Sequence, residues 1–191
     1  MANYGEELGY WYLRLNGYFP ITNFVIHQSE DIEYPTDCDI LGVRFPHVYE
    51  EIGGQRHDWD DALMSRVDIN EPAAVICEVK TGDLGAKPIF SQEKISYAVQ
   101  RLGIVEDVTG ILRDLEYKSL SERDGWKVFK LLIAYQKPNR DDCIFINIRD
   151  VKKFLIQRFR KYDLAKYRDR IFFNSALIQY LIDDVHKNKK V

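Results

Sequence analysis

The chain has 191 residues, of which 46% are hydrophobic and 30% are charged, and its net charge is -3. Single hydrophobic cores form at roughly 100 to 200 residues, and this composition excludes general disorder, so we predict one globular domain over residues 1–191. The sequence has neither a basic start followed by an apolar run nor a stretch of about 18 uncharged apolar residues. We therefore expect a cytoplasmic protein with no membrane partner. The three widely spaced cysteines are expected to be reduced and buried: Cys38, Cys77 and Cys143.

The charges are distributed unevenly along the chain. Residues 149–191 hold 12 Lys and Arg against five Asp and Glu, whereas residues 1–148 hold 15 against 25. Such asymmetry can mark a surface for a polyanion. The basic run "KKFLIQRFRKYDLAKYRDR" is favoured as an amphipathic helix with a solvated basic side. A surface that follows a nucleic-acid backbone is the alternative.

The first half of the chain begins with a helix and two strands. "GEELGYWYLRLNGYF" has the apolar spacing of a packed helix. Strands over 19–28 and 36–45 are expected to pair as a hairpin. Residues 46–70 contain glycines, a proline and many acids, which indicates an insertion with a short helix near 60–66.

The second half alternates strands and helices. The expected elements are a strand over 73–81, a helix over 91–104 with Ser91 as its N-cap, a helix over 105–120, strands over 126–137 and 143–149, and a basic, mainly helical extension over 149–191 with a break near "RDRIFFN". This order predicts an α/β (α+β) fold with a central mixed sheet flanked by helices.

The stretch "AVICEVKTG" carries two charges where a buried strand is expected. Because side chains alternate along a strand, Glu78 and Lys80 project from one face, about 6 to 7 Å apart. Val75, Cys77 and Val79 take the other face. Burying an ion costs several kcal/mol unless the ion is paired, hydrated or bound to a metal. On its own, such a pair is best explained as an ion pair on an edge strand.

Asp39, within the preceding strand "TDCDILGV", supplies a second carboxylate. Two carboxylates and a lysine form a site for a hard cation, and oxygen ligands suit Mg²⁺ or Mn²⁺. A neighbouring lysine can orient or help to deprotonate a water, or stabilise charge on a phosphate. A structural ion pair in an unrelated α/β protein is the alternative, and it predicts that Asp39 lies far from Glu78.

Asp39, "EVK" at 78–80 and the helix "GEELGYWYLRLNGYF" together resemble the PD-(D/E)xK, or restriction-endonuclease-like, nuclease superfamily. The helix is similar to the G-E-x-x-A-x-x-Y-L-x-x-x-G-Y helix of small Holliday-junction-resolvase-like members. The resemblance covers residues 5–102 and the strand at 126–136. It implies a core of the order α-β-β-β-α-β.

The resemblance also implies roles for five residues. Asp39 and Glu78 would hold Mg²⁺ or Mn²⁺ together with the Val79 carbonyl. Lys80 would face the attacking water and the scissile phosphate, and Glu6 would be the acid contributed by the helix.

The choice between Glu6 and Glu7 stays open, because the helix is apolar almost all round. Gly9 stands where the superfamily pattern often has alanine.

The function that the resemblance implies is metal-dependent endonuclease activity on nucleic acid, with DNA favoured over RNA and a homodimer as one compatible assembly. A catalytically inactive module of the same fold, binding nucleic acid or a protein, is the alternative. Specificity and biological pathway are left open.

Three further features have two interpretations each. Lys94 and Arg101, on the helix after "EVK", contact phosphate or are solvated. The run "HDWDD" at 57–61 is favoured as a solvated acidic loop over a second metal site. His27 and His47 are favoured as packed or surface residues over general bases.

Overall fold

The computed structural model describes residues 3–26, 36–49, 54–68, 70–85, 88–164 and 175–187. Within these residues one mixed sheet contains β1 (Phe19–Ile26), β2 (Thr36–Arg44), β3 (Ala73–Lys80), β4 (Leu120–Arg123), β5 (Trp126–Ala134) and β6 (Ile144–Asn147). The strand order is β1-β2-β3-β5-β4, and β6 lies beside the second half of β5. β1, β2 and β3 form an antiparallel meander, and β5 runs parallel to both β3 and β6. The predicted α/β class and the neighbouring positions of the first two strands are confirmed.

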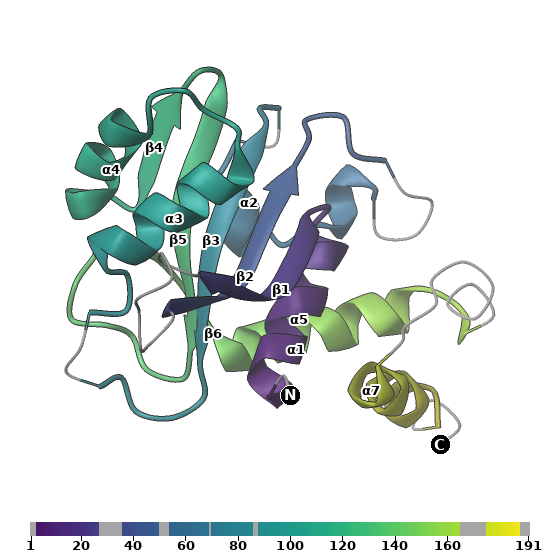
Figure 1. Ribbon diagram of the computed structural model, residues 1–191. Helices are drawn as coiled ribbons and strands as arrows, with labels where there is room; N and C mark the ends of the chain where they lie inside the picture. The colour runs from purple at the N-terminus through teal and green to yellow at the C-terminus, as the bar shows by residue number, and fades with distance from the viewer. Residues whose placement is uncertain are drawn as a thin grey trace.

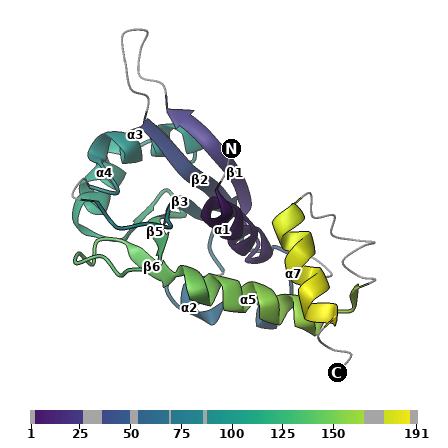
Figure 2. The ribbon, with the colours of Figure 1, turned by 90° about the horizontal axis from the view of Figure 1, so that it is seen from below.

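Helices cover both faces of the sheet (Figures 1 and 2). α1 (Tyr4–Leu15) and α5 (Ile148–Lys161) pack on one face, and α7 (Ala176–Lys187) packs against α5. α3 (Gln92–Leu102) and α4 (Val108–Tyr117) cover the other face. Among the described helices, none has the length and hydropathy needed to cross a lipid bilayer. The break predicted near "RDRIFFN" and the hairpin connection at 27–35 lie outside the described residues.

β3 is the central strand, and its side chains alternate as predicted. Val75, Cys77 and Val79 belong to the core formed with α1 and α5. Ala74 and Ile76 belong to the core formed with α3 and α4. Since both faces are covered, every residue of the strand is buried except the last, Lys80. All three cysteines of the chain are buried and without disulfides.

α1 lies very close to the sheet. Asn3 caps the helix, because its side chain accepts hydrogen bonds from the amides of Gly5 and Glu6. A Cβ added to Gly9 would lie 3.0 Å from Ile40 and 3.1 Å from Val79, which is tighter than ordinary contact. A small residue at this position therefore brings the helix down onto β2 and β3.

The predicted insertion lies between β2 and β3 and contains a short helix, α2 (Asp61–Met64), as expected. It is fastened to the C-terminus of α1. The buried Arg44 donates to the Asn16 carbonyl at 3.2 Å, and its guanidinium lies 4.3 Å from the ring centroid of Trp59. The Asn16 side chain accepts the Asp60 amide at 2.8 Å. The insertion therefore packs against α1, and β2 and β3 on either side of it remain paired neighbours.

The prediction of a solvated acidic loop at 57–61 is wrong for Asp58. This aspartate is the last residue of a single turn of 3-10 helix (Arg56–Asp58) and is buried, with 4% of its surface exposed. Lys161 and Tyr162, at the end of α5, both donate hydrogen bonds to its carboxylate. The basic side of α5 is therefore only partly solvated, because Arg158 on the same helix is also buried.

The predicted helix over 105–120 ends earlier than expected, and a strand was missed. α4 ends at Tyr117, and β4 pairs with β5 in an antiparallel hairpin. Its turn residues, Asp124 and Gly125, have φ values of 53° and 76°. Asp-Gly between two strands is a strong signal for a tight hairpin, and this dipeptide could have revealed β4.

Candidate functional site

The candidate site lies where β2 and β3 separate. Their antiparallel ladder ends at the pair Ile40 and Cys77, so Asp39 comes next opposite Glu78. The Asp39 side chain replaces the missing ladder acceptor, because its Oδ2 accepts the Val79 amide at 2.7 Å. This bond fixes the carboxylate against β3. β2 therefore places the Asp39 carboxylate beside β3, as the sequence predicted.

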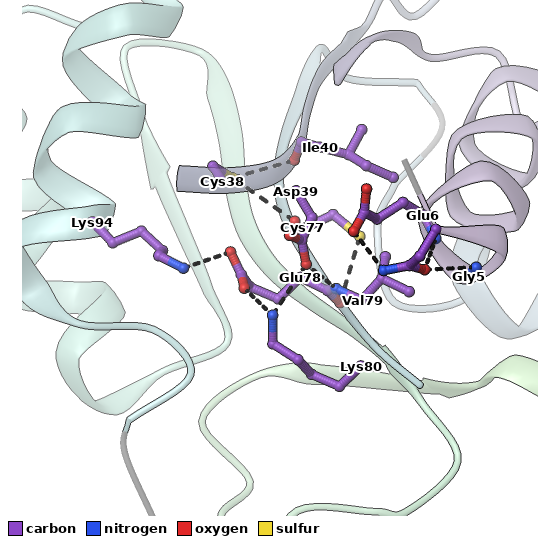
Figure 3. A network of polar contacts seen from close by, with 11 residues as sticks. Gly5, Glu6, Cys38, Asp39, Ile40, Cys77, Glu78, Val79, Lys80 and Lys94 are labelled. Atoms are coloured by element: carbon purple, nitrogen blue, oxygen red, sulfur yellow. Dashed lines mark hydrogen bonds and ion pairs between the residues drawn. The ribbon is translucent and has the colours of Figure 1, made fainter. Parts of the chain in front are cut away.

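Lys80 bridges the two carboxylates (Figure 3). Its Nζ lies 2.8 Å from Glu78 Oε2 and 3.2 Å from Asp39 Oδ2. Both acids therefore converge on one point. A structural ion pair in an unrelated α/β protein predicted that Asp39 would lie far from Glu78. The structure instead brings both carboxylates to the same ammonium group.

Lys94 adds a second ammonium from the face covered by α3. Ser91 caps this helix as predicted and accepts the Lys94 amide at 3.2 Å. The Lys94 Nζ lies 2.8 Å from Glu78 Oε1, so each oxygen of Glu78 has its own lysine. The Lys94 side chain is 13% exposed, which does not agree with a solvated surface position. Periodicity could have revealed this, because Lys94 precedes the buried Ala98 by four residues.

Arg101 lies at the other end of α3 and is exposed. Phosphate contact and a solvated position were both left open for Lys94 and Arg101, and the structure brings Lys94 into contact with Glu78.

Burial and charge set the electrostatics of the four groups. The Glu78 side chain is 1% exposed, whereas the Lys80 side chain is 38% exposed and gives the cluster its access to solvent. Burial, followed by the Asp39 charge, raises the pKa of Glu78, although both lysines oppose the shift. Burial alone would lower the pKa of Lys80, but the two carboxylates outweigh it and raise that pKa. Lys80 therefore remains an ammonium at neutral pH.

The two acids of α1 have different surroundings. Figure 3 shows the Glu6 side chain extending from α1, and its Oε1 accepts a hydrogen bond from Asn3 at 2.6 Å. Gly5 places this turn of the helix against Val79 and Thr81 at the end of β3. Glu7 instead accepts a hydrogen bond from Ser175, next to α7. Both acids belong to the first turn of α1, and they differ in their partners: Glu6 is bonded to Asn3, whereas Glu7 is bonded to Ser175.

The oxygen ligands can be compared with what Mg²⁺ requires. Within the described residues, no group of three or more His, Cys, Asp and Glu could hold a metal ion, so Glu6 does not complete a three-acid cluster. Mg²⁺ is commonly bound by one or two carboxylates, with water and substrate phosphate completing its shell. Asp39 and Glu78 fit that donor set. The Val79 carbonyl stays a predicted ligand.

The thiols near the site are poor candidates for ligands. Burial and the Glu78 charge raise the pKa of Cys38 to about 12, and burial also raises the pKa of Cys77. Both thiols are therefore protonated at neutral pH, whereas metals bind thiolates. Oxygen atoms remain the donors that this site can offer.

Comparison of the chain with protein-family models, with curated proteins and with solved structures gives no match.

Proposed function

We propose that the protein is a metal-dependent nuclease that hydrolyses phosphodiester bonds in DNA. One observation carries the proposal: Asp39 and Glu78, from adjacent strands, converge on a lysine that is partly open to solvent. Two carboxylates beside a cation match what phosphoryl chemistry needs, namely oxygen ligands for a hard ion and a positive charge for the phosphate.

The order of the elements supports the proposal. α1, β1, β2, β3, α3 and β5 follow one another in the order α-β-β-β-α-β, which is the order that the resemblance to PD-(D/E)xK nucleases implies. The 3-10 turn and α2 lie between β2 and β3, and α4 and β4 lie between α3 and β5. Asp39 lies on the second of these strands, and Glu78 and Lys80 lie on the third, as in the superfamily pattern.

Each residue of the cluster has a role in this proposal. Asp39 and Glu78 would hold Mg²⁺ or Mn²⁺, which when bound lowers the pKa of a coordinated water and neutralises charge on the phosphate. Lys80, whose pKa is raised, donates hydrogen bonds as an ammonium, which suits orientation of the water or stabilisation of phosphate charge. Lys94 holds the buried Glu78 in place through its own ion pair.

A non-catalytic module is the second candidate, because the charges of the cluster cancel without a metal. Two carboxylates and two ammonium groups have no net charge, and Lys80 contacts both acids. In this case Lys80 and the two acids act only to join β2 to β3. The chain would then bind nucleic acid or a protein without cleaving it.

Calorimetric titration with Mn²⁺ distinguishes the two candidates. We expect the wild-type protein to bind about one equivalent, and we expect Asp39→Asn and Glu78→Gln to abolish that heat. Asp141→Asn is the matched control, because Asp141 is 88% exposed and its ion pair is with Lys137. Absence of Mn²⁺ uptake by the wild type, or equal uptake by all variants, would favour the non-catalytic module.

A further inference from the structure

Two exposed tyrosines lie near the end of β3 at which the candidate site is found. Lys80 pairs with Ala134 of β5, and Ala134 pairs with Asn147 of β6. Tyr135 therefore follows immediately after the residue that faces Lys80. Tyr4 begins α1, and the hydroxyls of Tyr4 and Tyr135 lie 3.3 Å apart although 131 positions separate the residues.

A cation lies over the Tyr135 ring at the junction of β6 and α5. Asn147 donates from its side chain to the Tyr135 carbonyl at 2.9 Å. Its Oδ1 accepts the Arg149 amide, also at 2.9 Å. Asn147 thus connects the backbones of Tyr135 and Arg149, and the Arg149 guanidinium lies 5.7 Å from the Tyr135 ring centroid.

Both tyrosine rings are partly open to solvent. Tyr4 is 49% exposed and Tyr135 is 39% exposed, and Arg149 is also exposed. The hydrogen bond with Tyr135 raises the pKa of Tyr4, so the Tyr4 hydroxyl is neutral at neutral pH and does not repel an anion. An open aromatic face beside a guanidinium matches an unpaired nucleobase and its phosphate.

We propose that Tyr4, Tyr135 and Arg149 form a subsite for an unpaired nucleotide of single-stranded DNA next to the Asp39 and Glu78 cluster. This inference rests on the proposed nuclease function, because it assigns a substrate form to that site. A base would stack on the open Tyr4 ring, and Arg149 would contact the adjoining phosphate. Substrates that carry a single-stranded segment at the cleavage position would then be preferred over blunt duplexes.

Fluorescence anisotropy in EDTA tests the subsite without cleavage. The probes are a short fluorescein-labelled oligo(dT) and a blunt duplex of the same length. We expect Tyr4→Ala to weaken oligo(dT) binding about tenfold, since stacking on one aromatic ring contributes about 1 to 3 kcal/mol per base. Duplex binding should change less than about twofold.

Two control variants separate stacking from a structural role. Tyr4→Phe keeps the ring and loses the hydroxyl contact, so we expect oligo(dT) binding close to that of the wild type. Tyr117→Ala removes a tyrosine that is 74% exposed at the end of α4, and should also bind normally. Equal losses in Tyr4→Ala and Tyr4→Phe, equal losses for oligo(dT) and duplex, or unchanged binding by Tyr4→Ala would each overturn the subsite.

Failure of the nucleotide subsite can be distinguished from failure of the proposed nuclease function. Selective loss of oligo(dT) binding in Tyr4→Ala, in a protein that takes up no Mn²⁺ and cleaves no DNA, would support the subsite and reject the nuclease. Mn²⁺-dependent cleavage with normal binding by Tyr4→Ala would reject the subsite alone.

Discussion

Lys80→Met is expected to reduce Mg²⁺-dependent DNA cleavage by at least about 100-fold, the usual effect of removing one group that stabilises transition-state charge. The Lys80 ammonium is the only group in contact with both Asp39 and Glu78 among the described residues. Methionine keeps much of the side-chain length but carries no charge. Glu78→Gln should cause a loss of similar size, because it removes one of the two carboxylates that would hold the metal. Initial rates on a fluorescent oligonucleotide give the measurement.

The control for this loss is Lys137→Met. Lys137 pairs with Asp141 at the surface, and its side chain is 65% exposed. All three variants should show circular dichroism spectra like that of the wild type, since Lys80 lies at the end of its strand and glutamine preserves the shape of Glu78. Wild-type rates in a folded Lys80→Met protein would reject the role given to Lys80.

Asp58→Asn is expected to lower the free energy of unfolding by roughly 2 to 3 kcal/mol. The Asp58 side chain has no exposed surface and accepts hydrogen bonds from Lys161 and Tyr162. Breaking a buried ion pair typically costs about 3 to 5 kcal/mol, and the partial exposure of Lys161 reduces that value. Urea denaturation gives the measurement. Asp150→Asn, which breaks the exposed pair with Lys153, should cost less than about 1 kcal/mol.

The effect of Asp58 should depend on pH with a defined sign. Burial alone would raise the pKa of Asp58, but hydrogen bonds from Lys161 and Tyr162 and the Arg158 charge lower it below its ordinary value. The folded state therefore binds this proton less readily than the unfolded state. The stabilisation is present above the ordinary aspartate pKa of about 3.9 and is lost as pH falls through the folded-state pKa.

The difference in unfolding free energy between wild type and Asp58→Asn should therefore be constant from about pH 5 to 7. It should shrink below about pH 4. A difference that grows on acidification would show that Asp58 does not gain stability from its ionised form.

The elements that the sequence predicted correctly depend on local patterns. The alternation in "AVICEVKTG" identifies which residues of β3 are buried on each face, and Ser91 marks the start of α3. These features follow from strand geometry and from capping, both of which involve residues only a few positions apart. The position of Asp39 opposite Glu78 was predicted through the resemblance, since 38 residues separate them.

The features that were missed depend on distant partners. Asp58 is held by residues 103 and 104 positions away, and the pattern of "HDWDD" gives no sign of them. The contact between Tyr4 and Tyr135 likewise requires α1 and the end of β5 to meet. Lys94 combines a local and a distant cause. Helix periodicity places it on the buried face of α3, but its contact with Glu78 depends on the packing of α3 against β3.

A crystal structure with Mn²⁺ tests the central claim most directly. If Asp39 and Glu78 form a metal site, an anomalous peak should lie about 2.1 Å from an oxygen of each carboxylate, and the Lys80 Nζ should have moved away from the point where both acids now meet. If instead Lys80 still bridges Asp39 and Glu78 at saturating Mn²⁺, with no anomalous peak between them, the cluster is a structural ion pair and the proposed nuclease is wrong.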